Sequence, residues 1–155
     1  MEQKRCKHAA IVVKSLKKSG TFWAIVAGGC YVKTENDLFL KKKKQTWCDT
    51  NSVELFNFKT LKWKTFCASL AIARHSATVC EMNGYLYVSG GHRVELPTEF
   101  IYSIERCHLS SLQSSFDLIK MDYNMMKLQL QTIVSFPSSD DNCLLIMGQT
   151  DQGSN

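Results

Sequence analysis

The chain has 155 residues, of which 45% are hydrophobic and 21% are charged, so its composition is that of an ordinary globular domain and excludes a largely disordered chain. The formal net charge of +5 is mild, and no broad basic stripe interleaved with aromatic residues indicates nucleic-acid binding. No apolar stretch has the length of a signal peptide or a membrane span, so we expect a cytoplasmic location, with the nucleus as an alternative.

The first predicted element is an apolar hairpin. A basic residue and a histidine at positions 7–8 precede a short apolar strand at 9–13, and a second apolar strand at 22–27 ends in the pair Gly28-Gly29. Runs of about five apolar residues bounded by turn residues, without a 3.6-residue period, favour strands over helices. A glycine pair is expected where another backbone comes too close for a Cβ atom.

The next segment, residues 32–50, is polar and carries four adjacent lysines at 41–44. Like charges repel one another and favour solvent, so the segment is predicted to be a mobile loop. Three roles stay open for the lysines: a solubilising loop, a contact with an acidic partner, or a nuclear-import signal or nucleic-acid contact.

A second pair of strands follows this segment. An apolar strand begins at Val53-Glu54, and a polar turn leads to a strand that carries Trp63. The indole of Trp63 is large enough to fill the space between neighbouring sheets, and we predict that it lies there.

The same order of features then recurs. Arg74-His75 precedes a strand at 76–80, and a strand at 85–89 ends in Gly90-Gly91. Between these strands Asn83-Gly84 is a strong signal for a tight hairpin turn, because both positions tolerate a positive φ.

The recurrence extends beyond the glycines. Ile104-Glu105 answers to Val53-Glu54, and Phe116 takes the place of Trp63. A third, incomplete copy spans 130–148, with Asp140-Asp141 in its polar turn. Such units bury their apolar faces by stacking against copies of themselves, so the repeat decides the architecture.

These residues resemble the kelch repeat, in which an apolar run ends in Gly-Gly and is followed by an aromatic residue and then a Trp. Gly28 and Gly90 lie 62 positions apart, longer than the roughly 50 residues usual for kelch, and insertions explain the excess. The resemblance implies an all-β fold, a partial kelch-type β-propeller of four-stranded antiparallel blades. Blade one would span 7–67, blade two 74–121 and half of blade three 130–148.

A closed propeller needs about four to eight blades. We therefore expect the chain to be part of a larger propeller, a truncated product, or a subunit completed by other copies. The unpaired strand edge after Gly148 and the open flank of blade one favour self-association.

The resemblance also implies a non-enzymatic protein-interaction module, such as a substrate receptor of a cullin-type ubiquitin ligase or a cytoskeletal scaffold. The partner, a protein or an acidic or phosphorylated peptide, is expected on the loops after the glycine pairs and at the blade junction. The residues there are Tyr31, Lys33, Arg74, His92 and Arg93. A guanidinium offers a planar bidentate donor to carboxylate or phosphate, although Arg74 could instead satisfy carbonyl groups at the junction. The alternative is a fragment of a propeller enzyme resembling galactose oxidase, with copper held by Tyr and His.

The seven cysteines are odd in number and irregularly spaced, so we expect reduced thiols rather than a disulfide framework. No Cys-x-x-Cys pair is present, and Cys107 and His108, as neighbours in a strand, point to opposite faces, so neither a metal nor another cofactor is expected. His8 and His75 are expected to hydrogen-bond backbone groups, with a catalytic role as the alternative.

Overall fold

The computed structural model describes residues 1–14, 20–37, 42–66, 68–110, 115–119, 128–137 and 142–150. Over these residues the chain is all-β, with antiparallel strand pairing and no helix, which confirms the predicted all-β class. Within the same ranges there is accordingly no helix of the length and apolar character needed to cross a membrane.

The first sheet has four antiparallel strands in the order β1-β2-β5-β6. They are β1 (Ala9–Lys14), β2 (Phe22–Ala27), β5 (Val53–Asn57) and β6 (Lys62–Thr65). Strands β2 and β5 are neighbours in the sheet although they are not consecutive in the chain, because the segment between them leaves the sheet and returns to it.

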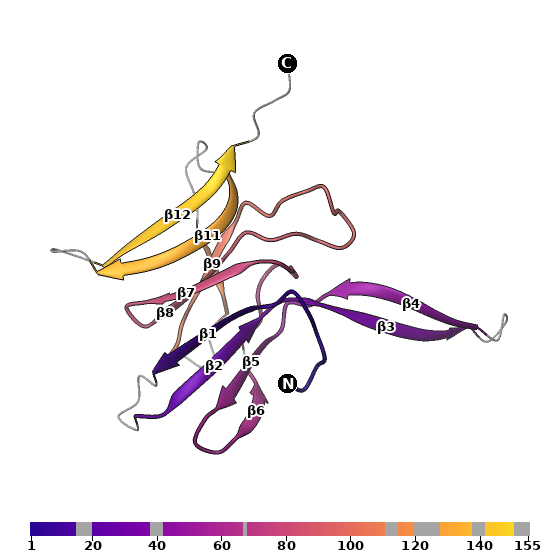
Figure 1. The fold of residues 1–155 in the computed structure, drawn as a ribbon, viewed down its shortest axis with the longest axis horizontal. Coiled ribbons are helices and arrows are strands. Elements are labelled where there is room, and N and C mark those ends of the chain that lie inside the picture. Colours follow the sequence, from indigo (N-terminus) through magenta and orange to yellow (C-terminus); the bar gives the residue numbers. More distant parts are fainter. Residues whose placement is uncertain are drawn as a thin grey trace.

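That segment is a β-hairpin, made of β3 (Cys30–Asp37) and β4 (Lys42–Asp49), and it projects away from the first sheet (Figure 1). The expectation of a loop over 32–50 is therefore wrong. The lysines at 42–44 are exposed strand residues, and Lys44 stands opposite the acidic Glu35. Cross-strand pairs of opposite charge offset the repulsion between adjacent lysines. Lys41 lies outside the described residues.

The second sheet repeats the meander, in the order β10-β9-β8-β7. Its strands are β7 (Thr78–Met82), β8 (Tyr85–Ser89), β9 (Ile104–His108) and β10 (Asp117–Ile119). The φ angles of Asn83 and Gly84 are 53° and 79°, so the predicted tight turn between β7 and β8 is confirmed.

A third unit contains the hairpin β11 (Leu128–Pro137) and β12 (Asn142–Thr150), whose pairing is interrupted by a bulge between Leu130 and Thr132. The hairpin lies along β7 and β8, and β7 in turn lies along β1. The second sheet thus stands between the first sheet and the third unit (Figure 1). The turn that contains Asp140-Asp141 is outside the described residues.

The main core is the layer between the first two sheets. Each strand turns alternate residues to each face, and the apolar residues of one face of each sheet meet in this layer. The first sheet contributes Val13, Ile25 and Leu55, and the second contributes Leu86 and Val88, all less than 9% exposed. A smaller cluster of Cys80, Tyr87 and Ile104 occupies the other face of the second sheet.

The two large aromatic residues of the repeat have different surroundings. Phe116 is 5% exposed and belongs to the core between the sheets. Trp63, which was expected between sheets, lies instead on the outer face of the first sheet, half-buried against Phe56 at 5.1 Å between ring centroids. The reason is positional, because Trp63 shares its face with Glu54 and not with the residues that meet the second sheet.

Candidate functional site

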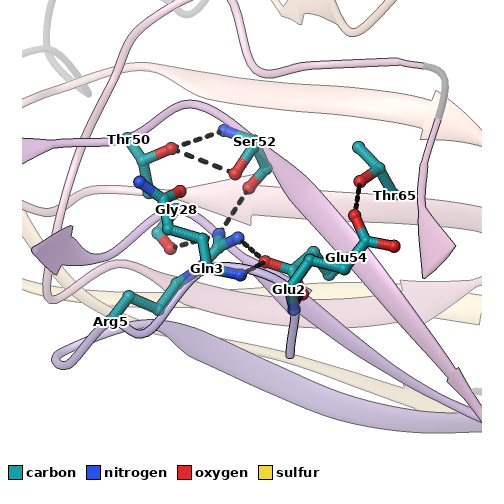
Figure 2. Close-up of polar contacts among 8 residues, drawn as sticks. All are labelled: Glu2, Gln3, Arg5, Gly28, Thr50, Ser52, Glu54 and Thr65. Atoms are coloured by element: carbon teal, nitrogen blue, oxygen red, sulfur yellow. Dashed lines mark hydrogen bonds and ion pairs between the residues drawn. The ribbon is translucent and has the colours of Figure 1, made fainter. Parts of the chain in front are cut away.

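A buried ion pair closes one end of the first sheet (Figure 2). The guanidinium of Arg5 donates to the carbonyl oxygens of Gly28 and Ser52, both at 3.0 Å, and pairs with the carboxylate of Glu54. The same carboxylate accepts the backbone N–H groups of residues 2–3, at 2.6 and 3.2 Å. A carboxylate with this many donors is well satisfied, although its side chain is only 2% exposed.

The second sheet contains the same network. Arg74 donates to the carbonyl oxygens of Gly90 and Ser103, and pairs with Glu105 at 2.5 Å. Glu105 accepts the N–H groups of residues 71–72, at 2.5 and 3.2 Å. The two glycine and serine carbonyls, the carboxylate and the two backbone N–H groups of the second network each have a counterpart in the first, whereas the bonds of Arg74 to the Ser103 hydroxyl and the Ile72 carbonyl do not.

This equivalence corrects the sequence alignment of the two copies. Arg74 corresponds to Arg5 and not to Lys7, so the alignment of Lys7-His8 with Arg74-His75 is wrong by two residues. The backbone agrees, because Lys7 and Ser76 occupy matching positions with φ of 51° and 54°.

Arg74 does not belong to a binding surface. Its side chain is 0% exposed and its donors are used by groups of the protein. Burial lowers the pKa of Arg74, and the charge of Glu105 acts against this shift. The predicted partner contact through Arg74 is therefore wrong, and the structural alternative describes its place.

The glycine pairs lie where two backbones touch. A Cβ atom on Gly28 would stand 2.5 Å from the carbonyl oxygen of Arg74, and one on Gly91 would stand 2.5 Å from that of His75. Gly29 in addition donates its N–H to the Arg74 carbonyl at 2.7 Å. Each glycine also has a positive φ, so both sterics and backbone conformation exclude a side chain there.

Beside this end of the sheets is a group of side chains that we call the junction cluster: Asp49, His75, His92, Val94 and Phe100. One carboxylate oxygen of Asp49 binds Nδ1 of His75 at 2.8 Å, and the other accepts the N–H of Val94 at 2.5 Å. His75 stacks on His92 with 5.8 Å between centroids, and His92 packs on Phe100 at 4.4 Å. Asp49 ends β4, so the projecting hairpin of the first unit is fastened to the second.

The two histidines singled out from the sequence do not bind backbone groups as expected. His75 uses its ring to bind the carboxylate of Asp49. Nδ1 of His8 is buried, and no hydrogen-bond partner for it lies in the described part of the chain.

Tyr31 and Lys33 do not share a face of the β3–β4 hairpin with Asp49. They lie on one face of the β3–β4 hairpin, where Lys33 is exposed and pairs with Glu35 at 2.6 Å. Alternation places Asp49 on the opposite face, since Asp49 pairs with Cys30 and not with a residue of the Tyr31 face. The contribution of Tyr31 and Lys33 to a common rim with His92 and Arg93 stays a prediction.

Among the residues that share the Asp49 face are Val32 and Trp47, a directly opposed pair with exposures of 41% and 53%. Arg93 precedes Val94, is exposed, and its guanidinium makes no hydrogen bond or ion pair with the described residues. Sequence reasoning missed Asp49, Trp47 and Phe100. The sequence of residues 42–49 has no apolar alternation, so it carried no signal that a strand places Trp47 and Asp49 beside this end of the sheets.

In the ranges that the structure describes, no three His, Cys, Asp or Glu residues lie so as to hold a metal ion. No protein-family model and no curated protein matches the sequence. The resemblance to kelch repeats therefore stays a prediction from the repeated residues of the sequence.

Proposed function

We propose that this chain is a partial kelch-type β-propeller that acts as a non-enzymatic protein-interaction module. The observation that supports the architecture is the repetition of one network, an arginine, a glutamate and a glycine pair, in two stacked sheets. A third unit continues the stack on the far side of the second sheet. Its role would be that of a substrate receptor in a ubiquitin ligase or of a scaffold, as the resemblance implies.

The outer face of the first sheet supports further stacking. It carries exposed apolar residues, among them Val12 at 57%, Phe22 at 51% and Phe58 at 47%, next to the half-buried Trp63. The corresponding face of the second sheet, which carries Phe116, is covered by the first sheet. By the same rule another sheet of this kind would cover the face of Trp63.

For the partner we propose a peptide with a carboxylate or phosphate group, bound beside the junction cluster. Arg93 offers a guanidinium with no partner in the described residues. Trp47, on the same hairpin face as Asp49, and Phe100, packed on His92, offer apolar surface. Hydrogen bonds to charged groups contribute about 1.5–3 kcal/mol, so one guanidinium is enough to select an anion. The exposed lysines at 42–44 would mainly speed the encounter.

The test uses immobilised full-length chain and degenerate peptides with a central phosphoserine, glutamate or glutamine. We expect retention of the two anionic sets over the glutamine set, and the comparison of phosphoserine with glutamate identifies the preferred anion. Arg93→Ala should raise the dissociation rate about tenfold or more. Glu95→Gln, which removes a negative charge from the same exposed loop, should slow dissociation.

Lys59 provides a control, because it lies in the turn between β5 and β6 at the opposite end of the first sheet. Lys59→Ala should leave retention unchanged. Equal retention of all three peptide sets, or loss of binding through Lys59→Ala with Arg93→Ala unaffected, would overturn the proposed site.

A further inference from the structure

Two thiols face one another in the first unit. Cys6 follows Arg5 and is exposed, whereas Cys30 begins β3 and is buried. Their Sγ atoms are 3.5 Å apart. The two residues also exchange both backbone hydrogen bonds, each with an N···O distance of 2.9 Å.

This backbone arrangement suits a covalent bond between the sulfurs. Opposed residues that exchange both hydrogen bonds have Cα atoms about 5.5 Å apart, within the range of about 4.4–6.8 Å that a disulfide spans. The positions themselves are those where the second unit places the stacked rings of His75 and His92. The repeat therefore sets two side chains face to face at this point, and only in the first unit are both of them thiols.

We propose that Cys6 and Cys30 are a modification site, where a reversible disulfide forms in reaction with a small-molecule disulfide. The thiolate of Cys6 attacks one sulfur of the small molecule and a thiolate leaves. The thiolate of Cys30 then attacks the Cys6 sulfur and releases the second small thiolate. Two protein thiols are oxidised, one small disulfide is reduced to two thiols, and the two protons of the protein thiols end on the sulfurs of these small thiols.

The surroundings decide which thiol reacts first. Burial, helped by the contact with Cys6, raises the pKa of Cys30 to about 11, with Asp49 acting in the same direction and Lys7 against it. The thiolate is the reacting form, so Cys30 is a slow attacking group at neutral pH. Cys6 is accessible from solvent and takes the first step, and Cys30 acts only once the activated sulfur stands beside it.

The disulfide would fasten the N-terminal segment to the first sheet. Residues 2–5 supply Arg5 and two backbone N–H groups to Glu54, and in the reduced protein they are held by these hydrogen bonds and by the backbone pairing of Cys6. A bond between Cys6 and Cys30 restricts the unfolded chain and leaves the folded contacts in place. We expect the oxidised protein to melt at a temperature higher by roughly 3 °C or more.

The experiment equilibrates the full chain with mixtures of reduced and oxidised glutathione, blocks free thiols with an alkylating reagent, and maps the peptides by mass spectrometry. We expect a linkage between Cys6 and Cys30 as the first disulfide to appear, with reversal by dithiothreitol. Cys48→Ser should keep it, because Cys48 lies on the opposite face of the β3–β4 hairpin.

Cys6→Ser and Cys30→Ser should each abolish the linkage and the rise in melting temperature, and circular dichroism checks that both variants fold. Mapping the disulfides of the protein without substitutions already tests the proposal, so the test remains even if a variant misfolds. A first disulfide that involves any other cysteine, or glutathione that stays attached to Cys6 without transfer to Cys30, would overturn the proposal.

Discussion

Replacing Arg74 by Met should lower the free energy of unfolding by about 3–5 kcal/mol, the cost of breaking a buried ion pair by removing one partner. Both side chains of the pair with Glu105 are 0% exposed. The change leaves a buried carboxylate with only the N–H groups of residues 71–72, and it removes donors from the carbonyl oxygens of Gly90 and Ser103. Because domains are stable by about 5–15 kcal/mol, this is a large fraction of the total.

Urea unfolding followed by circular dichroism measures the effect. Glu105→Gln alone should also destabilise, while the double variant should lose less than the sum of the two, with a coupling of about 1–3 kcal/mol. Lys33→Met is the matched control, because the pair of Lys33 with Glu35 is 56% exposed on both sides, and it should leave the unfolding curve unchanged. An Arg74→Met curve that coincides with the control would refute the reasoning.

Three other changes test separate parts of the structure. Phe116→Ala should lower the free energy of unfolding by about 3–5 kcal/mol, because it empties a buried aromatic site. Trp63→Ala should lower it clearly less, since the indole is only half-buried. Thermal unfolding that ranks the two variants in the reverse order contradicts the described core. Gly28→Ala should destabilise more than Gly20→Ala in the same assay. Both glycines have a positive φ, but only at Gly28 would the new Cβ atom stand 2.5 Å from a backbone oxygen, whereas at Gly20 it would meet nothing within 4 Å; equal losses would leave conformation alone as the cause. Burial raises the pKa of the Cys80 thiol from 9.0 to about 11, so the folded protein keeps this proton to a higher pH than the unfolded chain does. The free energy of unfolding should therefore fall as the pH rises from about 9 to 11. Cys80→Ala should make the urea midpoint less dependent on pH over this range, and a pH dependence equal to that of the unchanged protein speaks against the shift.

Local sequence patterns were enough to predict most of the strands. The apolar runs at 22–27 and 85–89 end at glycine pairs, and the runs at 78–82 and 85–89 form a hairpin because a two-residue turn joins them. Asn83-Gly84 needed no information from elsewhere in the chain, since a positive φ at both positions selects the turn. The β3–β4 hairpin was missed because its strands are exposed on most of both faces, and such strands show no apolar alternation.

The site depended on partners far away in the sequence. The alignment of Lys7-His8 with Arg74-His75 follows local similarity, but the true counterpart of Arg74 is defined by its ion pair with Glu105, 31 residues along the chain. Both side chains of this ion pair are 0% exposed, and the local sequence around Arg74 does not indicate that it is buried. The sequence could not tell which face of the hairpin carries Tyr31, because one residue of register decides the face of a strand.

The carboxylate of Glu105 has partners besides Arg74. It accepts the N–H groups of Ala71 and Ile72, which lie in the connection that leads from the first sheet to the second. If the connection at residues 71–72 unfolds, it loses its hydrogen bonds to Glu105 in the second sheet. Unfolding of one sheet therefore destabilises the next one, which is nearest-neighbour cooperativity between the stacked units. In a hydrogen-exchange experiment the amides of Ala71 and Ile72 should thus be protected as strongly as those of the central strands, although they belong to no strand themselves.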